Sequence, residues 1–296
     1  MPSSFIKRGF TDTYFMKVFF FAVFIIWGSS SVKAAMPPER IITLSGALTE
    51  TVDALGLGKN IVGTDVTSTY PASLSRVPKV SRNRSVSAEG LMAFRPGLVL
   101  APEGDVPKEI QYQLKEAGIR FVSIRQEYSV NGALNFIRKV AAACGVQARG
   151  ETLAKQTFVR VQAALSKVKS NPVTKGRVLF IYARGSGTML VAGKGSSLDA
   201  IIRLAGARNA IQEFTDFKPY TTEALVKANP DAILMFDFGL SSLGGRQAVL
   251  AMPGVSLTNA GKSSRVIDMD GSLLTSFSTR LPDAIAGLNE RLTASR

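Results

Sequence analysis

Two stretches that lie far apart in this chain repeat one unusual pattern. Residues 87–100 (SAEGLMAFRPGLVL) and 221–234 (TTEALVKANPDAIL) share a glutamate, a small residue, a leucine, a proline seven positions after the glutamate, and an apolar strand. Residues 48–61 and 197–211 share a helical pattern, a glycine and an isoleucine five positions later. Any α/β chain repeats helix, turn and strand, but the common Glu-to-Pro spacing favours a duplicated unit.

Short apolar runs alternate with helical patterns through the first copy, and the alternation restarts in the second. We expect strands at residues 40–44, 61–63, 97–101, 120–124 and 177–182, and helices at residues 49–55, 89–94 and 107–117. This alternation predicts an α/β fold with mainly parallel central sheets, one in each copy.

One long helical segment separates the two copies. Residues 150–170 contain no internal glycine or proline, and Leu153, Phe158, Val161 and Leu165 follow helical spacing. The predicted organisation is a signal peptide and two Rossmann-like lobes joined by one helix, with bounds 1–35, 36–145, 146–172 and 173–296. Ligands of such folds bind between lobes and at the carboxyl ends of strands, which places a ligand in an interlobe cleft.

The N-terminal segment has the pattern that is typical of an export signal. Lys7, Arg8 and Lys17 precede an apolar run at residues 18–27, and small residues follow up to position 35. A run of ten apolar residues is too short to cross about 30 Å of hydrocarbon. We therefore expect a cleaved signal peptide and a periplasmic protein.

Charge and cysteine content restrict the partners. The net charge is +14, of which about +11 remains after residue 35, a balance that suits anionic partners. Nucleic acid is not expected outside the cytoplasm. Cys144 is the single cysteine, so no internal disulfide can form, and its apolar surroundings predict a small buried side chain.

Enzymatic function is disfavoured by what the chain lacks. It has no histidine, so it contains no Ser-His-Asp or Cys-His set, and no HExxH or CxxC metal pattern. Residues 192–197 (AGKGSS) lack the upstream glycine spacing of a phosphate-binding loop, and no GxGxxG follows the first strand. We expect neither an enzyme nor a nucleotide-binding protein. An exported hydrolase is the alternative from another class.

Tyr70 stands on a polar run closed by Pro71, with Arg82, Arg84 and Glu89 downstream. From these residues alone, the ordinary interpretation is a half-buried loop tyrosine. The ordinary interpretation of the two arginines is that they belong to a solvated basic loop.

Three stretches give the chain a family resemblance: residues 63–71 (GTDVTSTYP), 86–100, and 238–245 (FGLSSLGG) followed by 269–285 (MDGSLLTSFSTRLPDAI). Nearly end to end, the mature chain resembles the periplasmic haem-binding proteins of bacterial haem ABC importers. These belong to the helix-linked class of substrate-binding proteins, with the siderophore and cobalamin binders. The Glu-to-Pro repeat is general to that class, whereas the Tyr-Pro turn and FGLSSLGG are more specific to the haem branch.

The resemblance implies that Tyr70 supplies a phenolate to the iron of ferric haem b, the transported ligand. Fe(III) is a hard acid that favours such a ligand. Some family members carry an arginine two residues after this tyrosine, where this chain has Ala72. Arg82, Arg84 and Arg184 are the candidates to pair with the phenolate or with the haem propionates, which suit a planar guanidinium. Arg82 stands where an aromatic residue is common. A methionine such as Met189 is available as a weak sixth ligand.

The remaining expectations concern the second lobe and the transporter. Phe238, Leu240 and Leu243 lie in an expected loop after a strand and are predicted to cover a porphyrin face. Glu89 and Glu223 occupy matching helix starts, where acids are ordinary. The resemblance implies that each docks onto one subunit of an inner-membrane ABC permease dimer. We expect a monomer, with an outer-membrane haem receptor upstream. A binder of a ferric siderophore or corrinoid stays open as the alternative.

Overall fold

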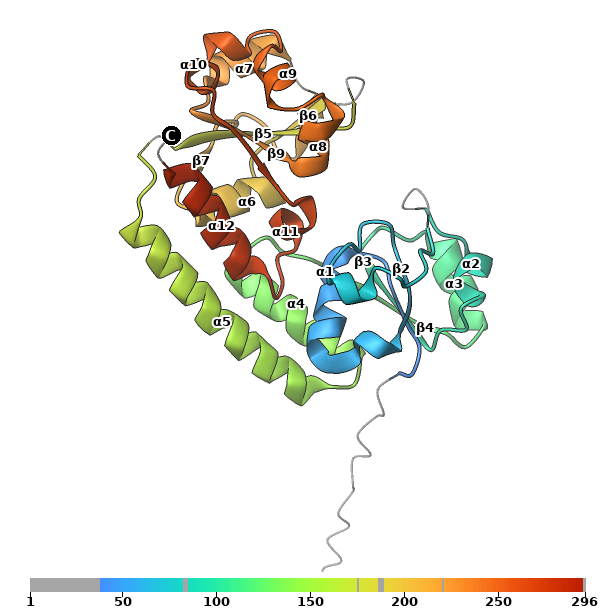
Figure 1. Ribbon diagram of the computed structural model, residues 1–296. Coiled ribbons are helices and arrows are strands. Elements are labelled where there is room, and N and C mark those ends of the chain that lie inside the picture. The colour runs from blue at the N-terminus through green and yellow to red at the C-terminus, as the bar shows by residue number, and fades with distance from the viewer. Residues whose placement is uncertain (1–37, 82–84, 175, 186–188, 220, 295–296) are drawn as a thin grey trace, which may run out of the picture. The chain divides into compact units, whose positions relative to one another are not determined.

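The computed structural model describes residues 38–81, 85–174, 176–185, 189–219, 221–294. Residues from Ala35 onward form one compact unit, and the predicted signal peptide lies outside the described residues. The predicted α/β class is confirmed, with one fully parallel sheet and one mixed sheet whose central strands are parallel (Figure 1). The bounds of the two lobes stay a prediction.

The first sheet has four strands in the order β2-β1-β3-β4, all parallel. The first half of the chain consists of β1 (Ile41–Thr43), α1 (Gly46–Val52), β2 (Ile61–Thr64), α2 (Ala88–Met92), β3 (Leu98–Pro102), α3 (Lys108–Glu116), β4 (Arg120–Ile124) and α4 (Val130–Ala143). A π-helical turn, Asp53–Leu57, extends α1, and short 3-10 turns cover Gly58–Asn60 and Ala72–Leu74.

Apolar side chains cover both faces of this sheet. Ile41 packs on one face with α1 and α4, where Cys144 is fully buried. Burial raises the pKa of the Cys144 thiol to about 11, as expected for a structural cysteine. Ile42 packs on the opposite face with Leu91 of α2 and Leu114 of α3.

The second sheet has the order β10-β9-β5-β6-β8, and β7 pairs with β5. Strands β10, β9 and β5 are parallel, whereas β6 and β8 are antiparallel additions that the alternation pattern did not predict. Its strands are β5 (Arg177–Ala183), β6 (Met189–Ala192), β7 (Arg208–Asn209), β8 (Phe217–Pro219), β9 (Ala232–Phe236) and β10 (Val266–Met269). Its helices are α6 (Ser197–Leu204), α7 (Thr222–Ala228), α8 (Asp237–Ser242), α9 (Arg246–Leu250), α10 (Asn259–Lys262), α11 (Gly271–Thr275) and α12 (Leu281–Thr293), with a 3-10 turn at Val255–Leu257.

The repeated sequence pattern has the same local geometry in both copies. Ser87 and Thr221 each cap a helix by accepting a hydrogen bond from a backbone amide three residues on. The residue before each repeat proline, Arg95 or Asn229, has a positive φ. Gly56 and Gly206 also have positive φ, which glycine adopts without strain. These shared features support the interpretation of a duplicated unit.

The predicted connecting helix is α5 (Gln147–Ser170), which lies within the expected bounds 146–172 and contains the helical run at residues 150–170. It packs against α4 from the first half and α12 at the C-terminus (Figure 1). Among the described residues, no helix is both long and apolar enough to cross a membrane.

Gly150 allows α5 to approach α4, because a Cβ at this position would overlap the Cβ of Ala141. An alanine inside a helix normally adds about 1 kcal/mol over glycine. Here the overlap should dominate, and Gly150→Ala should lower the free energy of unfolding by about 1–3 kcal/mol. Urea unfolding measures this change, with Ser166→Ala on the exposed side of α5 as the control. A gain in stability from Gly150→Ala would show that the two helices are not tightly packed there.

Candidate functional site

Tyr70 lies on the loop after β2, beyond the carboxyl end of a parallel strand, and its peptide bond to Pro71 is cis. The carboxylate of Asp65 accepts hydrogen bonds from the hydroxyls of Thr67 (2.5 Å) and Ser68 (2.6 Å). Lys79 donates to the Ser68 carbonyl at 2.5 Å. These bonds fix the loop, while the Tyr70 side chain stays 45% exposed. The tyrosine is therefore held in place but open to a ligand.

Arg280, on the segment between α11 and α12, covers the Tyr70 ring. Its guanidinium carbon lies 3.9 Å from the ring centroid. This is well within the range of a cation–π contact, about 6 Å. A residue from the second half of the chain therefore contacts the candidate iron ligand of the first half.

A buried carboxylate holds this arginine. Glu50, on α1, accepts from Arg280 Nη2 at 2.5 Å and from Nε at 3.0 Å, a bidentate arrangement. Arg280 Nη2 also donates to the Ser272 hydroxyl at 2.9 Å, and the Ser276 hydroxyl donates to Glu50 at 2.8 Å. The side chains of Glu50 and Arg280 are 1% and 13% exposed. The guanidinium is thus fixed on two sides before any ligand arrives.

Burial disfavours the charges of both members of this pair, but the net shifts of their pKa values have different outcomes. Burial raises the pKa of the Glu50 carboxyl above its usual value, although the hydrogen bonds and charge of Arg280 act against this. Burial also opposes the charge of Arg280, but Glu50, followed by Asp270 and Tyr70, together raise the pKa of the guanidinium. Arg280 is therefore a permanent cation against the tyrosine ring.

Helix α11 connects this cluster to the second sheet. Its cap, Asp270, follows the end of β10 and accepts hydrogen bonds from the Ser272 hydroxyl (2.6 Å) and the Leu273 amide (3.0 Å). Burial acts against the Asp270 charge, but these hydrogen bonds and Arg280 hold its pKa below the usual value. The next residue, Gly271, packs so closely against Phe236 and Phe238 that a Cβ there would lie 3.3 Å from the Phe238 ring.

Phe238 belongs to an aromatic cluster at the carboxyl ends of β5 and β9. Its ring centroid lies 5.4 Å from that of Phe236 and 6.1 Å from that of Tyr182. Phe238 is 45% exposed. Arg184, also exposed, directly follows β5, and the next residue donates its amide to the Ser242 hydroxyl at 3.0 Å. Aromatic surface and a cation are therefore both present at this edge of the sheet.

The expected loop at FGLSSLGG was wrong, because the segment begins with a helix, α8. Leu240 and Leu243 are half-buried and pack on the core cluster that includes Ile181 and Val249. That packing stabilises a short helix whose glycine and serines give weak helix propensity. Of the three apolar residues expected to cover a ligand, Phe238 is the exposed one.

Sequence reasoning missed Glu50 and Arg280. Two features of the sequence indicated them. One is an acidic residue inside the apolar pattern of the expected helix at residues 49–55, and the other is the lone arginine in the segment STRLPDAI. Arg82 and Arg84 lie outside the described residues. Within the described part of the chain, no group of three or more His, Cys, Asp or Glu side chains is placed to hold a metal ion.

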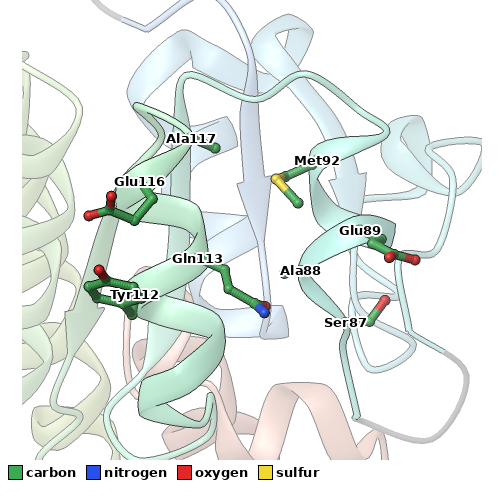
Figure 2. Close-up of a pocket in the computed structure, with 8 residues that line it drawn as sticks. All are labelled: Ser87, Ala88, Glu89, Met92, Tyr112, Gln113, Glu116 and Ala117. Carbon is green, nitrogen blue, oxygen red and sulfur yellow. The ribbon is translucent and has the colours of Figure 1, made fainter.

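The two repeat glutamates lie on exposed helix starts. Glu89 is in the first turn of α2 and Glu223 in the first turn of α7. Beside Glu89, a hollow of about 590 Å³ separates α2 from α3. Figure 2 shows Met92 and Gln113 pointing into it, with Glu89 on the far side of α2. Tyr112, which is 64% exposed, and Glu116 line the α3 side.

Comparison with known proteins identifies the family. The model of the periplasmic binding protein family matches residues 41–273, so the chain belongs to this family. It is a binding protein rather than an enzyme, as the sequence predicted.

Relatives with known structures share the fold. The periplasmic heme-binding protein BhuT, solved in complex with two hemes, is 41% identical, with a TM-score of 0.81 over 86% of this chain and 97% of that one. The periplasmic heme-binding protein RhuT from Roseiflexus sp. RS-1 is 35% identical, with a TM-score of 0.81 over 86% and 98%.

Curated relatives include binders of another ligand. An uncharacterized ABC transporter substrate-binding lipoprotein of Bacillus subtilis, YvrC, is 30% identical over 257 residues, 86% of this chain and 80% of the relative. A vitamin B12-binding protein of Vibrio parahaemolyticus is 25% identical over 221 residues, 73% of this chain and 77% of the relative.

Proposed function

We propose that this protein binds ferric haem in the periplasm, through the phenolate of Tyr70, and delivers it to an inner-membrane ABC importer. The observation that carries the proposal is the similarity to BhuT, a heme-binding protein, at 41% identity over 86% of the chain. That likeness spans both sheets and the connecting helix.

The chemistry of the described residues fits such a ligand. Tyr70 offers a hard oxygen ligand for Fe(III). The exposed Phe238 ring offers an apolar surface for a porphyrin. Arg184, together with Arg82 and Arg84, offers cations for the propionates. Arg280 links these parts, since it contacts Tyr70 and also Ser272, whose neighbour Gly271 packs on Phe238.

A corrinoid or ferric siderophore is the second candidate. It is favoured by the relatives named as vitamin B12-binding proteins, and such a ligand does not need a phenolate. An absorption titration of the protein without its signal peptide separates the two. We expect saturable binding of ferric haem with a phenolate-to-iron charge-transfer band, and much weaker binding of cyanocobalamin. Binding of cyanocobalamin without binding of haem would favour the second candidate.

The location and partner follow from the family. Export through the predicted signal peptide would leave the mature protein in the periplasm. YvrC is named as a substrate-binding lipoprotein of an ABC transporter, and an ABC permease dimer is the partner that we propose for this chain. An outer-membrane haem receptor would supply the haem.

Glu89 and Glu223 are the proposed contacts with the two permease subunits. Neither carboxylate has a hydrogen bond or ion pair within the part of the chain that the structure describes. Glu89→Arg and Glu223→Arg should each lower haem-stimulated ATP hydrolysis by the reconstituted importer by about 10-fold or more, because opposite charges across a docking surface become like charges. Haem affinity should stay unchanged.

Glu109→Arg is the matched control, since Glu109 is another exposed acid in the first turn of a helix, α3. This variant should retain the stimulation of the wild type. Equal losses of haem-stimulated ATP hydrolysis in all three variants would indicate an effect of overall charge rather than docking at the repeat glutamates.

A further inference from the structure

Among the residues of its turn that the structure describes, no cation stacks on the Tyr70 ring, and Ala72 stands where some members of the family carry an arginine. A phenolate bound to iron in a half-buried site is stabilised by a nearby cation or hydrogen-bond donor. Among the described residues, the guanidinium stacked on the Tyr70 ring belongs to Arg280, whose carbon lies 3.9 Å from the ring centroid. The charge that the turn lacks is therefore supplied from the second half of the chain.

We propose that Arg280, anchored by Glu50, is the positioning residue of the tyrosine ligand: it fixes the Tyr70 ring and favours negative charge on it. The inference rests on the proposed haem function and adds a role for two residues outside the Tyr-Pro turn. The long side chain of a free arginine would lose much conformational freedom on forming this contact. The bidentate carboxylate of Glu50 has already removed that freedom, so the contact with Tyr70 is preorganised.

The burial of the pair distinguishes it from an ordinary surface contact. The side chains of Glu50 and Arg280 are 1% and 13% exposed, whereas Tyr70 as a residue is 45% exposed. The guanidinium is thus shielded from water where it pairs with Glu50, and it lies against the ring of Tyr70. Charge interactions in such surroundings are weakened by solvent much less than those on the surface. Asp270 and Glu50 are the acids that face the guanidinium, and both contribute to its raised pKa.

The Glu50–Arg280 contact also joins the two halves of the chain, since its partners are 230 residues apart. Tyr70 and Glu50 both precede α5, and Arg280 follows it. Tyr70 and Glu50 of the first half therefore contact the same arginine, Arg280, of the second half. Haem ligation by Tyr70 is consequently sensitive to the contact between the halves.

The test compares haem complexes of the wild type, Arg280→Met and Arg280→Lys. Removing the cation makes the Tyr70 oxygen more electron-rich. We expect the charge-transfer band of Arg280→Met to move to longer wavelength. Haem affinity at pH 7 should fall by about 10-fold, as for other residues that support a metal ligand. Arg280→Lys, which keeps the charge but not the planar fork, should lie between the two.

The double variant Glu50→Gln/Arg280→Met avoids an unpaired buried carboxylate and should fold even if the single variant does not. It should show the same shift of the charge-transfer band. Arg160→Met is the matched control. Arg160 pairs with Asp283 at 2.7 Å and donates to the carbonyl of Thr279, which is next to Arg280 in the chain. Its spectrum and haem affinity should be those of the wild type.

The outcomes separate this inference from the proposed function. A wild-type protein that binds no haem overturns the proposed function and, with it, the inference. If wild type binds haem with the charge-transfer band, and both Arg280→Met and the double variant keep the same band and the same haem affinity, Arg280 does not act on Tyr70. The proposed function would then stand without it.

Discussion

Replacing Tyr70 with phenylalanine should lower the affinity for ferric haem by about 100-fold or more and abolish the phenolate-to-iron charge-transfer band. The phenolate is the proposed bond between protein and iron. Loss of a residue that only supports a metal ligand costs about 10–100-fold, so loss of the ligand itself should cost at least as much. Because the Tyr70 side chain is 45% exposed, the free energy of unfolding should change by less than about 0.5 kcal/mol. Absorption titration and urea unfolding measure the two effects.

Tyr112→Phe is the control for this variant, since Tyr112 is an exposed tyrosine that lines the hollow between α2 and α3. It should bind haem as the wild type does. A Tyr70→Phe protein with unchanged affinity and an unchanged spectrum would remove Tyr70 from the iron. Haem binding by other residues would remain possible in that case.

The second large effect concerns stability without haem. Arg280→Met leaves Glu50 buried and unpaired and should lower the free energy of unfolding by about 3–5 kcal/mol. The control is Arg138→Met on α4, which removes an exposed ion pair with Glu151 whose side chains are 40% and 52% exposed. That change should cost less than about 1 kcal/mol. Urea unfolding of the haem-free protein compares the two variants. Equal losses of unfolding free energy would show that the Glu50–Arg280 pair is not buried in solution.

The loss in Arg280→Met should also depend on pH. Without the guanidinium, only the hydrogen bond from Ser276 still offsets the effect of burial, so the pKa of Glu50 rises further above 4.5, its value in the unfolded chain. The folded variant then binds this proton more tightly than the unfolded chain, and its stability falls as pH rises through the folded-state pKa. Asp270 also loses the cation that lowers its pKa, which acts in the same direction. The difference from wild type should therefore be larger at pH 8 than at pH 5, and a smaller difference at pH 8 would contradict this account.

Local patterns predicted much of the fold. The strand at residues 120–124 has the predicted bounds, and the long helix ends at residue 170 as expected. Strands β6 and β8 were missed because they are short, and β8 is exposed along its length. The helix expected at residues 49–55 begins instead at Gly46 and continues as a π-helical turn, since the hydroxyl of Ser45 caps it by accepting from the Leu48 amide.

The site was predicted in part, because its main contact joins distant segments. Tyr70, Phe238 and Arg184 each follow the carboxyl end of a strand, where sequence reasoning placed ligand-binding residues. The pairing of Glu50 with Arg280 depends on how the two halves meet, which no local spacing records. Leu240 and Leu243 were assigned to the ligand because they follow a strand within FGLSSLGG, whereas the structure packs their side chains on the core.

The central claim is that Tyr70 is the protein's ligand to haem iron, and a crystal structure of the haem-loaded mature protein tests it most directly. We predict that the hydroxyl oxygen of Tyr70 is an axial ligand of the iron, with the Arg280 guanidinium still stacked on the tyrosine ring. An iron bound instead by another side chain, such as Met189, or a haem seated away from Tyr70, would contradict the claim.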